Sequence, residues 1–156
     1  MERREFIALL GMAAAVMPTD ARAEPARSPD SMAARLIGAW GYVSSVSTRK
    51  DGSTFDRWGS SPKGIFVFDR SGHYAQIIIG SESRVFGAKT TCSFGTYTVD
   101  ETKKTFSTNI EASSIPKLTG SFQTREILML TADQMKYSNP ITTTGAHAEV
   151  LWKRLS

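Results

Sequence analysis

Hydrophobic and polar residues alternate with a period of two along most of the chain after Ala39. In 104–112 the alternation places Phe106, Thr108 and Ile110 on one face and Thr105, Ser107, Asn109 and Glu111 on the other. A period of two is typical of a β-strand with one buried face. The pattern predicts strands near 39–47, 54–58, 63–68, 73–79, 92–99, 104–112, 119–130, 134–138 and 146–154.

Short turn sequences separate most of these strands. The runs 49–52 and 69–72 each end in a glycine, which readily adopts the positive φ of a tight turn. The polar run 100–103 is a third turn. Strands that follow one another through tight turns pair antiparallel, and closing such a meander into a barrel removes its exposed edges. We therefore predict an all-β fold, an antiparallel up-and-down barrel of about eight or nine strands with room for one small ligand.

A short N-terminal helix is predicted before the first strand. Ser28-Pro29-Asp30 has the sequence of a helix start, with a serine cap, proline in the first helical position and an acid in the first turn. Met32 and Leu36 are four residues apart and therefore share one face of a helix. We expect a helix over 29–36 that closes one end of the barrel.

The chain divides into a leader and one barrel domain. Residues 24–35 are assigned to the leader and the short helix, and residues 36–156 to the barrel. Within the barrel, 80–91 has no regular period and is predicted to be a long loop. Long loops in compact domains often serve as lids, and a surface loop packed on the barrel rim is the alternative.

Residues 1–23 have the pattern of an export signal. Arg3-Arg4 precedes an apolar run over 6–17, which is too short to span a bilayer, and Ala21-Arg22-Ala23 is a small-x-small cleavage pattern. The start of the segment resembles a bacterial twin-arginine signal, and the general secretory route is the alternative. We expect a periplasmic or secreted bacterial protein without an integral membrane span after processing.

Composition and charge argue against several classes of function. The formal net charge is +4, and no basic run is interleaved with aromatic residues, which disfavours nucleic-acid binding. Cys92 is the single cysteine, so no disulfide can form within the chain. Cys92, His73 and His147 are far apart and lack the spacing of metal ligands. We expect no metal and no cofactor, and the oligomeric state stays open.

The order of several short motifs resembles the bacterial and fungal lipocalin-like domain family. The motifs are Leu36-Ile37-Gly38-Ala39-Trp40, Asp51-Gly52, Pro62-Lys63-Gly64, Asp69-Arg70-Ser71-Gly72-His73, Phe94-Gly95-Thr96-Tyr97-Thr98-Val99, Glu111-Ala112-Ser113, Pro116, Arg125 and Trp152-Lys153-Arg154. The resemblance extends from about Leu36 to Arg154 and implies a barrel similar to the lipocalins, which carry small hydrophobic molecules. It also implies that Arg154, or alternatively Lys153, packs across Trp40, next to Gly38, where the barrel closes.

Four polar residues are the candidates for a ligand-binding site: His73, Tyr97, Glu111 and Arg125. Tyr97 and Glu111 are expected on adjacent strands and Arg125 on the next, and neighbouring strands are only about 4.8 Å apart. A buried glutamate needs a partner, and arginine is the best one available. Glu111 and Arg125 would then hold the polar end of a ligand, with Tyr97 donating a hydrogen bond. The alternative is a structural or solvated ion pair, and an exposed His73 at a rim.

Three hypotheses of function follow. The first is an exported lipocalin-like barrel that binds a small, largely apolar molecule in its interior. The second is an isomerase or cyclase on the same barrel, with Glu111 or His73 as general base, although no catalytic motif is present. The third is a barrel with a filled core that serves as a structural or interaction module. The interior volume distinguishes the third hypothesis from the other two.

Overall fold

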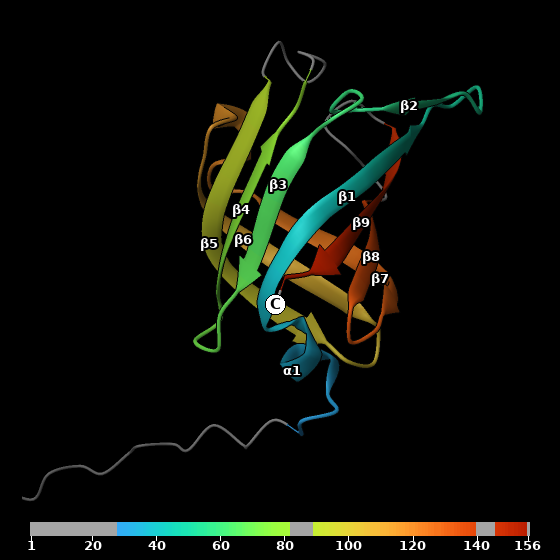
Figure 1. The fold of residues 1–156 in the computed structure, drawn as a ribbon. Coiled ribbons are helices and arrows are strands. Elements are labelled where there is room, and N and C mark those ends of the chain that lie inside the picture. The colour runs from blue at the N-terminus through green and yellow to red at the C-terminus, as the bar shows by residue number, and fades with distance from the viewer. Residues whose placement is uncertain (1–27, 82–88, 140–145, 156) are drawn as a thin grey trace, which may run out of the picture.

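A computed structural model describes residues 28–81, 89–139 and 146–155 (Figure 1). The expected export signal and most of the expected loop over 80–91 lie outside these residues. The described part contains one α-helix, one short 3₁₀ helix and nine strands. They are α1 (Met32–Leu36), β1 (Gly38–Thr48), β2 (Thr54–Asp56), β3 (Lys63–Phe68), β4 (His73–Ile79), β5 (Thr90–Asp100), β6 (Thr105–Ser113), η1 (Pro116–Leu118), β7 (Phe122–Leu130), β8 (Gln134–Asn139) and β9 (His147–Arg154).

The strands form one closed antiparallel barrel. From β3 to β9 each strand pairs with the next in sequence, and β1 pairs with both β3 and β9. The pairing of β1 with β9 closes the barrel. The short strand β2 is additional and pairs antiparallel with the last residues of β1. The predicted all-β, up-and-down barrel with a short N-terminal helix is therefore confirmed. The burial of side chains follows the predicted period of two. Along β4, for example, every second residue from Tyr74 to Ile78 is buried.

Aromatic side chains fill the end of the barrel nearest α1. Phe66 contacts Phe68, Tyr74, Phe106, Tyr137 and Trp152, with ring centroids 4.2–6.5 Å apart. Most of these pairs are edge-to-face, the arrangement that the ring quadrupoles favour. Phe66, Phe106 and Trp152 are fully buried. This part of the barrel is a packed core, so space for a ligand has to lie toward the other end.

The helix α1 begins later than predicted. Its cap is Ser31, whose Oγ accepts a hydrogen bond from the Ala34 N–H at 3.1 Å. Ser28 instead accepts a backbone bond from Ser31, and Pro29 lies inside that turn. Proline with φ near −65° suits the second position of a turn as well as the first position of a helix, which explains the error.

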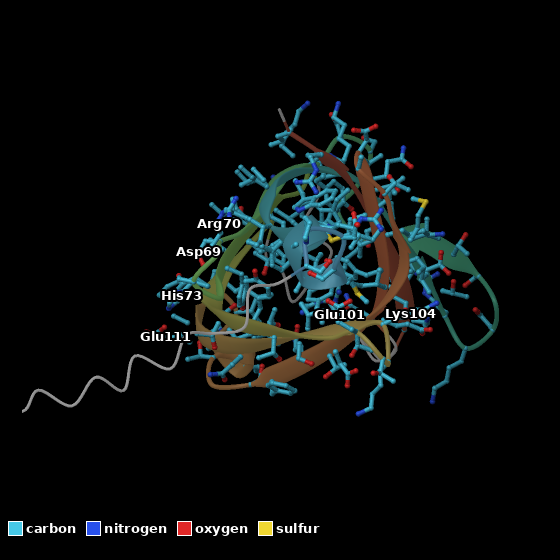
Figure 2. All side chains as sticks on the ribbon, turned by 90° about the horizontal axis from the view of Figure 1, so that it is seen from below. Asp69, Arg70, His73, Glu101, Lys104 and Glu111 are labelled. Atoms are coloured by element: carbon cyan, nitrogen blue, oxygen red, sulfur yellow. The ribbon has the colours of Figure 1, made fainter. Side chains whose placement is uncertain are left out.

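Contacts from the barrel hold α1 across its end (Figure 2). The Glu101 carboxylate, in the β5–β6 turn, accepts hydrogen bonds from the N–H groups of Met32 and Ala33 at 3.0 and 2.9 Å. These are two of the N–H groups that a helix start leaves without backbone partners. Leu36 is fully buried against the core. The expectation that the helix closes one end of the barrel is confirmed.

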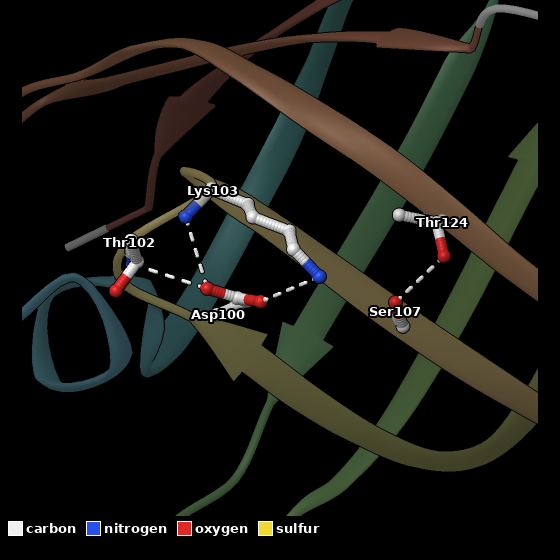
Figure 3. A network of polar contacts seen from close by, with 5 residues as sticks. All are labelled: Asp100, Thr102, Lys103, Ser107 and Thr124. Atoms are coloured by element: carbon white, nitrogen blue, oxygen red, sulfur yellow. Dashed lines mark hydrogen bonds and ion pairs between the residues drawn. The ribbon is translucent and has the colours of Figure 1, made fainter.

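The β5–β6 turn that carries Glu101 is stabilised locally (Figure 3). The Asp100 carboxylate accepts hydrogen bonds from the backbone N–H groups of Lys103 and Thr102 at 2.9 and 3.1 Å, and pairs with the Lys103 ammonium at 3.5 Å. The backbone bond from Lys103 lowers the pKa of Asp100 below its usual range. On the neighbouring strands, the hydroxyls of Ser107 and Thr124 share a hydrogen bond at 2.8 Å. The turn therefore presents Glu101 to α1 in a fixed position.

Arg154 and Trp40 meet where the barrel closes, as the family resemblance implied. The Arg154 guanidinium carbon lies 4.1 Å from the centre of the Trp40 ring. The same guanidinium donates to the carbonyls of Ile37 at 2.9 Å and Ala132 at 2.6 Å. Gly38 has a φ of +128°, and a Cβ there would lie 2.7 Å from Arg154 Nη1. Glycine at this position therefore leaves room for the arginine.

Candidate ligand-binding cavity

A cavity of about 520 Å³ opens at the end of the barrel away from α1. Its wall includes Thr91 and Ser93 at the beginning of β5 and Asn139 at the end of β8, whereas the turn that contacts α1 lies at the opposite end of β5. The volume falls within the range of about 300–1,000 Å³ that is typical of small-molecule sites. The barrel is thus packed at one end and hollow at the other.

Part of the cavity wall is apolar. The apolar side chains come from five different elements and the segments next to them: Trp58, Ile78, Ile110, Ile115, Leu118 and Val150. Ile78 and Ile110 face inward because they follow the period-two pattern of β4 and β6. This surface suits the hydrocarbon part of a ligand.

Arg125 is the most deeply buried charged group of the cavity wall. It lies on the inner face of β7 and its side chain is 6 % exposed. Nη1 donates to Thr108 Oγ1 at 2.8 Å, and Nη2 donates to Gln123 Oε1 at 2.6 Å. The guanidinium carbon lies 5.5 Å from the Phe106 ring centre and 5.6 Å from that of Tyr137. The sequence prediction that Arg125 faces the interior is correct.

The wall contains further polar groups besides Arg125. Gln76 and Tyr137 are buried and lie side by side, with the Gln76 amide nitrogen 3.4 Å from the Tyr137 hydroxyl. Arg57 and Lys117 add two more cationic side chains. Burial lowers the pKa of the Arg57 guanidinium below its usual value. No Asp or Glu occurs among the described residues of the wall.

Glu111 does not lie beside Arg125, and the predicted ion pair is wrong. Glu111 is exposed on the outer face of β6 (Figure 2), whereas Arg125 is buried on the inner face of β7. The reason is the pleat: Phe106, Thr108 and Ile110 face inward, so the next residue must face outward. Proximity of neighbouring strands does not bring two side chains together when they lie on opposite faces.

Tyr97 and His73 are both at the closed end of the barrel. The Tyr97 side chain is buried against Phe68, and its hydroxyl donates to the carbonyl of Asp69 at 2.8 Å. His73 is exposed, and its Nδ1 lies 2.8 Å from Ser71 Oγ in the β3–β4 turn. Neither belongs to the described cavity wall, so the structure brings none of the predicted residues together with Arg125.

The sequence prediction missed several residues at the cavity, and the strand pattern indicates two polar ones, Gln76 in the wall and Thr108 beside Arg125. Gln76 occupies an inward position of β4 between Tyr74 and Ile78, and Thr108 lies between Phe106 and Ile110 on β6. A polar residue in phase with buried apolar ones indicates a polar group inside the barrel. Arg57 and Lys117 gave no such signal, because both lie outside the long strands.

The described part of the chain offers neither a metal site nor a membrane-spanning helix. No group of three or more His, Cys, Asp or Glu side chains there is arranged to hold a metal ion. None of its helices is long and apolar enough to cross a membrane.

Solved structures with a similar fold include designed and natural barrels. A redesigned β-barrel is 19 % identical with a TM-score of 0.48, covering 80 % of this chain and 95 % of its own. Bovine odorant-binding protein in complex with a selenium-containing odorant is 15 % identical with a TM-score of 0.46, covering 83 % and 76 %. No curated protein sequence matches the chain significantly.

Residues 81–155 match the family model of the lipocalin-like domain. The matched part begins just after β4 and contains β5 to β9, including Arg125 and Arg154. The motifs of β1 to β4 that suggested the same family lie before it, and the structure joins them to the matched part in one closed barrel. The resemblance to the lipocalin-like domain family inferred from the sequence is therefore confirmed by the match over residues 81–155.

Proposed function

We propose that this protein is an exported lipocalin-like barrel that binds a small, largely apolar molecule in its cavity. The observation that carries the proposal is the hollow end of the barrel, about 520 Å³ lined by isoleucine, valine and tryptophan side chains together with a few buried polar groups. Small-molecule sites have this composition, with apolar walls that supply affinity and a few polar groups that fix orientation.

The other two hypotheses have less support. A structural or interaction module with a filled core would have no internal space of this size. An isomerase or cyclase based on Glu111 or His73 would need one of these bases near the bound molecule. Both side chains are exposed, Glu111 on the outside of β6 and His73 next to the β3–β4 turn, away from the cavity.

Binding can be tested with N-phenyl-1-naphthylamine, a neutral apolar dye whose fluorescence rises in apolar sites. We expect saturable binding of one dye per chain. Ile78→Trp places a bulky ring in the cavity and should weaken binding by about tenfold or more, because it removes space that the dye occupies. Ile77→Trp is the matched control, since Ile77 is adjacent in sequence but 41 % exposed on the outside of the same strand.

Three results would contradict the proposal. They are no saturable binding, equal loss of binding in both tryptophan variants, and undiminished binding by a folded Ile78→Trp variant. Thermal melting of both variants establishes that each one is folded before binding is compared.

Export is proposed from the N-terminal segment. Arg3-Arg4, the apolar run and the small-x-small pattern support cleavage after Ala23 and delivery to the periplasm or medium of a bacterium. Replacing Arg3-Arg4 with Lys-Lys should leave the precursor in the cytoplasm, as judged by cell fractionation and the size of the protein. Unimpaired export of that variant would rule out the twin-arginine route.

A further inference from the structure

Among the described residues, the buried guanidinium of Arg125 has no carboxylate partner. Its two hydrogen-bond acceptors, Thr108 Oγ1 and Gln123 Oε1, are both neutral. Its Nε–H is buried and has no partner among the described residues. Buried charges in proteins are normally paired, because transfer of an unpaired ion out of water is costly. The charge of Arg125 therefore has no counter-ion in the part of the chain that the structure describes.

The surroundings of Arg125 favour a cation but do not neutralise it. The faces of Phe106 and Tyr137 lie 5.5 and 5.6 Å from the guanidinium carbon. Aromatic faces attract a cation through their quadrupoles and carry no net charge. Two of the five N–H donors of the guanidinium are used by neutral oxygens, which leaves donors for an additional acceptor.

The described residues of the wall supply no negative charge to Arg125, because they include no Asp or Glu. Glu126 is next to Arg125 in sequence but is exposed on the outer face of β7. The buried positive charge of Arg125 favours a small anion over a cation at this position.

Polar and apolar groups of the wall suit two parts of one molecule. Arg125, Gln76 and Tyr137 are buried hydrogen-bonding groups. Ile78 and Ile110 add apolar surface to the same wall. A molecule with an anionic head and a hydrocarbon body would satisfy both kinds of surface at once.

We propose that the ligand of this barrel is a small organic carboxylate, with its carboxylate bound by Arg125 and its hydrocarbon part against the isoleucine side chains of the cavity. The planar guanidinium matches a carboxylate in shape as well as in charge. The proposal rests on the proposed small-molecule binding and specifies the class of molecule. Arg125 is then the residue that determines specificity for the charged head.

The test compares two competitors that differ only in the head group. Decanoate and 1-decanol are each titrated into the wild-type protein with bound N-phenyl-1-naphthylamine, and displacement of the dye is measured. We expect decanoate to displace the dye at a concentration about tenfold or more below that of decanol, because a hydrogen bond to a charged group contributes more than one to a neutral group. The neutral dye reports binding in the cavity without depending on the charge.

Variants of Arg125 assign this preference to one residue. Arg125→Met should remove the advantage of decanoate over decanol, measured as the ratio of the two displacing concentrations. Arg125→Lys keeps the charge and should keep part of the advantage. Arg70→Met removes the same charge from the exposed β3–β4 turn and should leave the preference unchanged. Melting curves of all three variants verify folding.

The outcomes separate the two proposals. Failure of the dye to bind the wild-type protein would overturn small-molecule binding itself. Dye binding with no preference for decanoate over decanol would overturn the carboxylate proposal and leave small-molecule binding in place. A preference that persists in Arg125→Met would also overturn it, because the charge would then be recognised elsewhere.

Discussion

Replacing Trp40 with alanine is expected to lower the free energy of unfolding by about 3–5 kcal/mol, the usual cost of truncating a fully buried aromatic side chain. Trp40 is 0 % exposed, and its Nε1 donates to the Leu36 carbonyl at 2.8 Å. Truncation leaves a void beneath α1. It also removes the ring that lies under the Arg154 guanidinium, at the position where β1 pairs with β9.

The measurement is urea unfolding followed by circular dichroism. Trp40→Phe should lower the free energy of unfolding by less than Trp40→Ala, because it keeps an aromatic face under Arg154. The remaining loss reflects the smaller ring and the missing hydrogen bond to Leu36. Val43→Ala is the control on the same strand, since Val43 is 45 % exposed and its truncation should change stability by about 0.5 kcal/mol or less. A Trp40→Ala protein as stable as the Val43→Ala control would contradict the role of Trp40 in closing the barrel.

Replacing Gly95 with alanine is expected to lower the free energy of unfolding by about 3 kcal/mol, the upper end of the usual cost of forcing an extra group into a packed site. A Cβ at Gly95 would lie 2.0 Å from the Asn109 carbonyl oxygen and 2.9 Å from the Glu111 nitrogen. Both are backbone atoms of β6, so neither can rotate away. The register between β5 and β6 shifts at this point, and the added methyl group would separate the two strands.

Gly120→Ala is the matched control for Gly95→Ala. Gly120 has a φ of +75°, and the methyl group of an alanine there would meet open space, so the substitution costs about 1 kcal/mol through backbone conformation alone. The difference between the two variants in chemical unfolding measures the steric term. Equal destabilisation would mean that close contact between β5 and β6 is not what requires glycine at residue 95.

The strands were predictable because two independent features of the sequence coincide in them, the period-two alternation and the turn residues at the strand ends. In β3 and β4 the period-two pattern is bounded by the turn sequence 69–72, and both strands have the predicted bounds. The strand predicted over 119–130 begins three residues too early, because residues 119–120 form a turn, in which Gly120 has a positive φ, and β7 begins at Phe122. Strand bounds were least certain where a loop and a strand share the same residue types.

The site was only partly predictable. Whether a side chain faces the inside of a barrel depends on its position in the alternation along the strand and not on its residue type. Arg125 is in phase with the buried residue Ile127 and lies inside, whereas Glu111 is out of phase with Ile110 and lies outside. Applying the pattern of 104–112 to Glu111 would have excluded it. The positions of Arg57 and Lys117 depend on how the segments around β2 and η1 fold over the open end, which no local pattern records.

The central claim, that a small molecule binds inside the hollow end of the barrel, can be tested most directly by methyl NMR of isoleucine-labelled protein. Three isoleucines, Ile78, Ile110 and Ile115, line the cavity, and three others, Ile65, Ile77 and Ile79, are exposed on the outside of the sheet. Titration with decanoate is predicted to shift the methyl signals of the first set and leave those of the second set in place. Shifts confined to the outer set, or no saturable shifts at all, would contradict the account.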